Sequence, residues 1–81
     1  MTTMRAKMQI ILVEQHMGGS ETLHFCAVAR SNGYPADGTD EDNTFAKFSP
    51  SASLKITVAN PALAGKLKPG DKFYVDFTPA A

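Results

Sequence analysis

The main pattern in the sequence is an alternation of apolar and polar residues, which is typical of β-strands with one buried face. In residues 4–13 the even positions are apolar throughout, and the odd positions become apolar from Ile11 onward, so this strand is expected to be covered on both faces in its second half. The alternation returns in residues 21–30, 53–59 and 72–78. Gly18 and Gly19 lie between the first two segments and can adopt the positive φ torsions of a tight turn, so these segments are predicted to form a β-hairpin.

A short fifth strand is predicted over residues 44–48, and Pro50, which cannot donate to a ladder, ends it. Asn60 and Pro61 form a good helix start, and Gly65 lies where one helical turn would stop. Five strands with one short helical turn before the last strand predict an all-β, mainly antiparallel fold. We expect a small five-stranded barrel or bent sheet, either SH3-like or OB-like.

Residues 31–43 are rich in Asn, Asp, Gly and Pro, and Tyr34 is their only large apolar residue, so they are predicted to form an exposed loop. The whole chain, residues 1–81, is predicted to be a single domain because a chain of this length supports only one modest core. Cys26 is the only cysteine, which excludes an intramolecular disulfide. A homo-oligomer is therefore the expected source of additional stability.

Eight basic and eight acidic residues give a net charge of zero, which argues against extended nucleic-acid binding. The sequence contains no apolar run of 18 residues and no hydrophobic signal core near its start, so we expect no membrane contact and a cytoplasmic location.

Residues 43–80 carry a longer motif, NTFAKFSPSASLKITVANPALAGKLKPGDKFYVDFTPA. This stretch resembles a group of small proteins encoded by tailed bacteriophages and prophages. The group shares two aromatic residues around a Lys, a Ser/Thr-Pro-Ser step, a strand, an Asn-Pro-Ala turn and a closing strand similar to Gly-Asp-Lys-Phe-Tyr-Val-Asp-Phe. The resemblance covers about half of the chain and implies a phage or prophage origin, hence the cytoplasm of an infected bacterial host or the virion, but no particular activity.

Two groups of residues are candidates for binding. The segment that begins at Asn43 combines an amide, an ammonium group, hydroxyls and two aromatic rings, a mixture that can stack on a base and donate to phosphates. Its alternative interpretation is structural, with the aromatic rings in the core and the Lys solvated. The ligand-binding candidates are Asn43, Phe45, Lys47, Phe48, Ser49 and Ser51. On the outward face of the last strand, Tyr74 lies between Lys72 and Asp76 and suits an interface.

Two other clusters are weaker candidates. The acidic residues Asp37, Asp40, Glu41 and Asp42 do not have the spacing of an EF-hand loop, so we expect them to be solvated rather than to bind a metal. His24 and Cys26 are two residues apart and share a strand face, as a nucleophilic pair would require, but no residue is evidently placed to orient the histidine. The sequence therefore predicts neither an enzyme nor a cofactor.

These observations predict a non-enzymatic, phage-encoded accessory protein that binds a host protein or a small nucleotide-like ligand, as a counter-defence protein would. One alternative is a structural virion component, such as a decoration or head-tail protein. A second alternative is an OB-like protein that binds single-stranded nucleic acid, although the net charge of zero counts against it.

Overall fold

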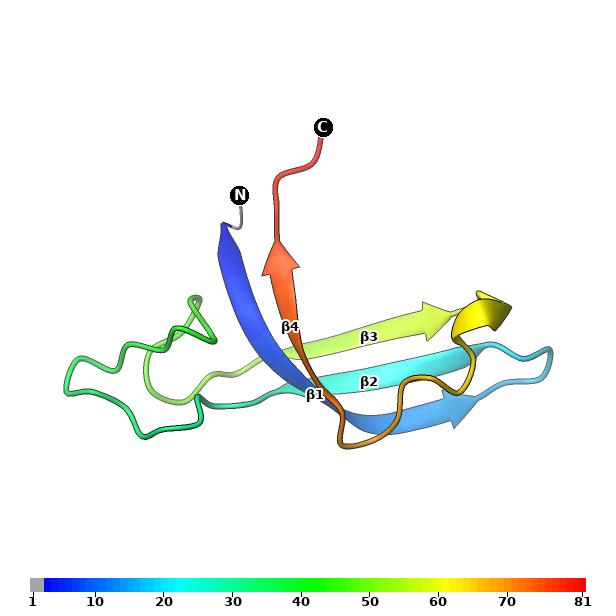
Figure 1. Ribbon diagram of the computed structural model, residues 1–81, viewed down its shortest axis with the longest axis horizontal. Helices are drawn as coiled ribbons and strands as arrows, with labels where there is room; N and C mark the ends of the chain where they lie inside the picture. Colours follow the sequence, from blue (N-terminus) through cyan, green and yellow to red (C-terminus); the bar gives the residue numbers. More distant parts are fainter. Residues whose placement is uncertain (1–2) are drawn as a thin grey trace.

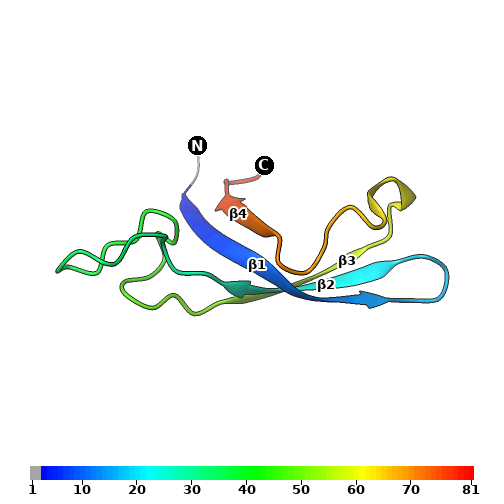
Figure 2. The same ribbon diagram turned by 60° about the horizontal axis from the view of Figure 1, so that its bottom comes forward.

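The computed structural model describes residues 3–81, which form one curled antiparallel sheet with a single short helical turn (Figure 1). The elements are β1 (Met4–Gln15), β2 (Glu21–Ala27), β3 (Ser53–Val58), the 3-10 helix η1 (Pro61–Leu63) and β4 (Lys72–Phe77). The strand order across the sheet is β3-β2-β1-β4. The all-β class and the helical turn before the last strand are confirmed, but the sheet has four strands where the sequence predicts five, and it is an open half-barrel (Figure 2).

The long strand β1 connects the two halves of the sheet. Its residues 4–9 pair with β4, and its residues 8–15 pair with β2. The register shifts between Ile10 and Leu12, which marks a β-bulge with Ile11 as the extra residue. Ile11 in the bulge and Leu12 after it are exposed, so the expectation that this part of the strand is covered on both faces is wrong. The apolar run reflects an irregular register instead of a fully buried strand.

The core lies on the inner face of the curl. Its fully buried apolar residues are Ala6, Met8, Ile10, Leu23 and Phe25, all from β1 and β2. Residues from β3, β4 and the connections pack against them and are only partly buried, because the open side of the half-barrel leaves them without cover.

The connection from β3 to β4 crosses one end of the curl. Asn60 caps η1 by accepting a hydrogen bond from the Ala62 N–H at 3.0 Å, which agrees with the predicted helix start. Farther along, Leu67 packs against the core. The buried carboxylate of Glu21 accepts the Gly65 N–H at 3.1 Å, so it fixes this connection to the start of β2.

The predicted strand over residues 44–48 does not form. That segment contains only an isolated bridge between Thr39 and Lys47. Instead, the Thr44 side chain accepts the Arg5 N–H at 2.8 Å, and the Thr44 N–H donates to the Arg5 carbonyl at 2.9 Å. Because β2 ends at Ala27, before the end that the sequence predicts, β1 has unpaired backbone groups here that this segment satisfies mainly with side chains.

The loop over residues 31–43 is exposed only in part. Residues 31–33 and 35–37 are exposed, whereas Asp40 and Asn43 are buried, which differs from the fully exposed loop expected from its composition. Asp40 accepts hydrogen bonds from the backbone N–H groups of Asp42 at 3.0 Å and Asn43 at 3.1 Å. These bonds make a compact turn that carries the end of the loop against β1.

Candidate functional site

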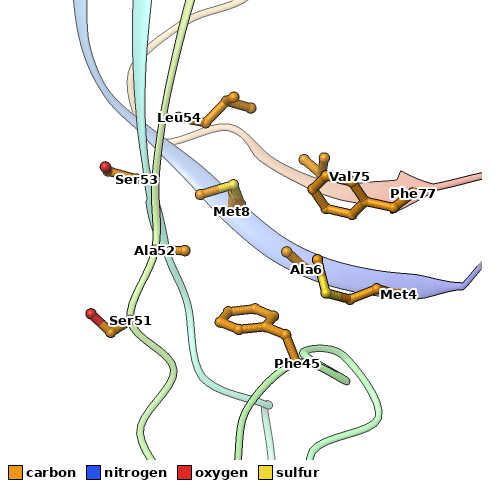
Figure 3. A pocket seen from close by; sticks show the side chains of 10 residues that line it. All are labelled: Met4, Ala6, Met8, Phe45, Ser51, Ala52, Ser53, Leu54, Val75 and Phe77. Carbon is orange, nitrogen blue, oxygen red and sulfur yellow. The ribbon is translucent and has the colours of Figure 1, made fainter.

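An apolar cleft of about 180 Å³ lies on the open side of the half-barrel, between β3 and β4 (Figure 3). Its lining comes from both ends of the chain and consists of Met4, Ala6, Met8, Phe45, Ser51, Ala52, Ser53, Leu54, Val75 and Phe77. Ala52, Leu54 and the Phe45 ring point into the cleft, whereas the hydroxyls of Ser51 and Ser53 point away from it (Figure 3). The walls that face each other are therefore almost entirely apolar.

β3 borders the cleft and is an edge strand of the sheet, so within residues 3–81 the backbone groups on its outer side have no strand partner. The Ala27 N–H donates to the Ala52 carbonyl at 3.1 Å, so Ala52 directs its backbone groups toward β2. Because successive residues of a strand direct these groups to opposite sides, Ser53 and Lys55 direct theirs away from β2. The cleft is thus bordered by a free strand edge as well as by apolar side chains.

The other edge of the sheet is β4. Ile10 exchanges hydrogen bonds with the connection before β4, accepting the Gly70 N–H at 2.8 Å and donating to the Asp71 carbonyl at 2.9 Å. By the same alternation, Val75 directs its N–H and C=O toward β1, and Tyr74 and Asp76 direct theirs outward. Both edges of the half-barrel are therefore open to another strand.

A second hollow, of about 360 Å³, lies beside the 39–47 turn and is more polar. Its lining consists of Thr39, Asp40, Thr44, Phe45, Ala46 and Lys47. Phe45 lines both this hollow and the apolar cleft.

The six ligand-binding residues expected from the sequence do not share one site. Phe45 and Ser51 line the apolar cleft, and Lys47 lines the polar hollow. Phe48 has a φ of 58° and turns its ring toward Tyr34, with 5.8 Å between the ring centroids. Ser49 is exposed and lines neither the cleft nor the polar hollow.

Asn43, the sixth of these residues, is completely buried, with 0% of its surface exposed. Its Oδ1 accepts the Lys7 N–H at 2.8 Å, and its Nδ2 donates to the Val28 carbonyl at 2.7 Å and to Asp40 Oδ2 at 3.1 Å. The side-chain amide thus continues the β1 ladder where β2 leaves it, and its bonds are made within the protein.

The outer face of β1 and β4 carries a polar network that includes two of the expected interface residues. Arg5 Nε donates to Asp76 Oδ1 at 2.6 Å, and its guanidinium lies 4.5 Å from the centroid of the Tyr74 ring. The Tyr74 hydroxyl donates to Asp42 at 3.0 Å, and Lys7 Nζ lies 3.5 Å from the same carboxylate. The hydrogen bond from Arg5 lowers the pKa of Asp76, and the hydrogen bond to Asp42 raises the pKa of Tyr74. The network holds the 40–43 turn on the sheet.

The remaining candidates contact separate partners. His24 Nε2 forms a hydrogen bond with the Glu14 carboxyl group, and this bond lowers the pKa of Glu14. His16 Nε2 lies 2.7 Å from the Thr22 hydroxyl. Cys26 is half-buried on the same face as His24. Within residues 3–81, no group of three or more His, Cys, Asp or Glu side chains is placed to hold a metal ion. No helix in that range is long and apolar enough to cross a membrane.

No family model matches the chain, and no curated protein or solved structure is significantly similar to it. The cleft itself is the feature that sequence reasoning missed. Alternation identifies Leu54, Val75 and Phe77 as inward-facing, but it does not say whether a neighbouring strand covers them. The available signal is the weakness of the predicted 44–48 strand, which is only five residues long and is followed closely by Pro50.

Proposed function

We propose that this protein is a non-enzymatic accessory protein that binds an extended apolar segment of a partner protein in the cleft of its half-barrel. The segment adds to the free edge of β3 and places alternate side chains in the cleft. The observation that carries the proposal is the combination of an apolar cleft with unpaired backbone groups along its border at Ser53 and Lys55.

Strand addition suits both parts of this surface. The partner's backbone pairs with the free N–H and C=O groups of the edge, and its alternate side chains fill pockets on one face. Burial of apolar surface contributes roughly 25 cal/mol per Å². Phe77 is 48% exposed and gains cover in such a complex. A bound segment would supply the fifth strand that the chain itself does not form.

A protein segment is favoured over a nucleotide-like ligand by the chemistry of the lining. The cleft walls present apolar carbon, and the Ser51 and Ser53 hydroxyls point away from it (Figure 3). A nucleotide would require donors for its phosphates at the same site. The phage resemblance of residues 43–80 makes a protein of the bacterial host the expected partner, with binding in the host cytoplasm.

The test is a selection of peptides from a random display library on the immobilised protein, followed by titration of a selected peptide into isotope-labelled protein. The expected result is an apolar, alternating peptide that shifts the amide resonances of residues 51–55 and 75–77. It should also slow hydrogen exchange at Ser53 and Lys55, whose N–H groups become paired.

A pair of matched variants locates the site. Ala52 points into the cleft, so Ala52→Leu is expected to weaken peptide binding by about tenfold or more, whereas Ala59→Leu, at an exposed position beyond β3, should change it less than about twofold. A circular dichroism melt confirms that both variants fold. Failure to select any peptide, or shifts confined to the polar hollow around Lys47, would overturn the proposal.

A structural role in the phage particle is the second candidate, and the observation that favours it is that both sheet edges are open. Edge strands can join neighbouring subunits in an extended assembly. Mass spectrometry of purified particles separates the two functions, because a virion component is present in many copies and an accessory protein is absent.

A further inference from the structure

We propose that β4 pairs with β4 of a second copy of this chain, forming an antiparallel two-fold dimer centred on Tyr74. This inference concerns the edge of the sheet opposite β3 and does not rest on the proposed function. It begins from the exposure of β4, where Phe73 is 38%, Tyr74 53% and Phe77 48% exposed although β4 belongs to the sheet.

Between Lys72 at its start and Asp76 near its end, the free edge of β4 carries no charged residue, Pro or bulge that would keep another strand away. Such edges are commonly protected by Lys, Pro or a bulge, and the free edge of β3 carries Lys55 at its middle. The two charged residues of β4, Lys72 and Asp76, lie toward its ends, and Arg5 of the same chain pairs with Asp76 at 2.6 Å. What remains is a regular strand with its Tyr74 and Asp76 backbone groups directed outward.

The sequence of β4 is complementary to itself about Tyr74. An antiparallel two-fold axis at this residue places Lys72 of each copy opposite Asp76 of the other, which gives two opposite-charge pairs on the outer face. On the inner face the same axis places Phe73 opposite Val75. Both kinds of cross-strand pair are favourable. In this register the residues whose backbone groups point outward, Lys72, Tyr74 and Asp76, lie opposite the same set in the other copy, so their N–H and C=O groups can pair across the two-fold axis.

Other pairings of the two edges fit less well. A two-fold pairing of β3 centred on Lys55 would place like charges opposite each other. Pairing β3 of one copy with β4 of the next can match Lys55 with Asp76, but each such interface contains one charge pair where the β4 dimer contains two. That head-to-tail contact is also not self-limiting, so it yields a ring or a filament.

Small size adds a reason for a dimer. Among residues 3–81 only five apolar residues are buried, and Cys26 has no second cysteine in the chain with which to form a disulfide. Chains of this length commonly gain stability by association. A dimer through β4 would cover Phe73 and Val75 while leaving the β3 edge free for the partner segment.

The test is sedimentation equilibrium of the full chain over micromolar to millimolar concentrations. A reversible dimer is expected. Lys72→Glu should raise its dissociation constant by about tenfold or more, because two attractive pairs become repulsive, whereas Lys66→Glu, the same charge change at an exposed position outside the strand, should change it less than about twofold.

Variants with exchanged charges test the proposed strand register directly. Asp76→Lys and Lys72→Glu chains should each dimerise poorly alone, and a mixture of the two should restore dimers, since every cross-strand pair is then of opposite charge. Circular dichroism of each variant confirms that it folds. A monomer at all concentrations, a dimer insensitive to Lys72→Glu, no rescue on mixing, or assemblies that keep growing with concentration would each overturn the inference.

Discussion

Replacing Asn43 tests whether this buried amide is structural. Asn43→Ala removes three side-chain hydrogen bonds and leaves the Lys7 N–H and the Val28 carbonyl without partners at a site where Asn43 is 0% exposed. An unsatisfied buried polar group costs about 1–3 kcal/mol. The two backbone groups lie at a part-buried edge, so we expect a total loss of about 2–4 kcal/mol.

That loss is large compared with the stability of the domain, which we expect to be roughly 4–12 kcal/mol for a chain of this length. With a urea slope of about 1 kcal/mol per molar, the unfolding midpoint should fall by roughly 2 M or more. Urea titration followed by circular dichroism measures this directly. Asn43→Asp preserves the shape but removes both N–H donors and places a second carboxylate beside Asp40, so at pH 7 it should be at least as destabilising.

The control is Asn32→Ala, because Asn32 lies in the exposed part of the same loop and its replacement should cost less than about 0.5 kcal/mol. If Asn43→Ala were equally mild, the bonding role assigned to this amide would be refuted. Loss of peptide binding without loss of stability would instead support the ligand-binding role that the sequence suggests for Asn43.

Three further changes test other parts of the fold. A Cβ added at Gly38 would lie 2.5 Å from the Phe48 ring, whereas Gly65 has nearly the same φ with open space around it. In thermal melts Gly65→Ala should therefore lower the free energy of unfolding by about 1 kcal/mol and Gly38→Ala by at least about 1 kcal/mol more, and equal losses would contradict the packing of Gly38 against Phe48. Because folding lowers the pKa of Asp76, this residue stabilises the fold at pH values above its ordinary pKa of about 3.9, and the stabilisation is lost as the pH falls through the lowered pKa. Asp76→Asn should therefore reduce the difference between the urea midpoints at pH 7 and pH 3, and an unchanged difference would exclude this ion pair as a source of acid sensitivity. Glu21→Ala should speed hydrogen exchange in residues 61–68, which its carboxylate holds through Gly65, and unchanged exchange would show that other contacts hold this connection.

The strands, the first hairpin and the helical turn could be predicted because their signals are local. Alternation, the Gly18-Gly19 turn and the Asn60 cap each act over a few residues. The pairing of Asn43 could not be predicted in this way, because it depends on the Lys7 N–H, 36 residues away. Whether an amide faces a ligand or another part of the chain is decided by tertiary structure.

The residues of the candidate binding segment lie on separate surfaces for a related reason. Its residues are adjacent in sequence, but the positive φ of Phe48 turns that ring toward Tyr34 while Phe45 points into the cleft. Composition identifies chemistry that a segment could supply. It does not determine which of the side chains face the same space.

The buried amide and the open cleft have a common origin in the early end of β2. Because β2 stops at Ala27, the Lys7 N–H and the backbone groups of Arg5 need other partners, and Asn43 and Thr44 supply them mainly through their side chains. A residue that satisfies a neighbour with its side chain leaves its own backbone free to turn, so the chain leaves the sheet at this point instead of continuing as a fifth strand. The space between β3 and β4 therefore stays open, and Phe45, carried by the same turn, becomes part of the cleft lining. It follows that restoring regular pairing beside β1 would be expected to remove the cleft.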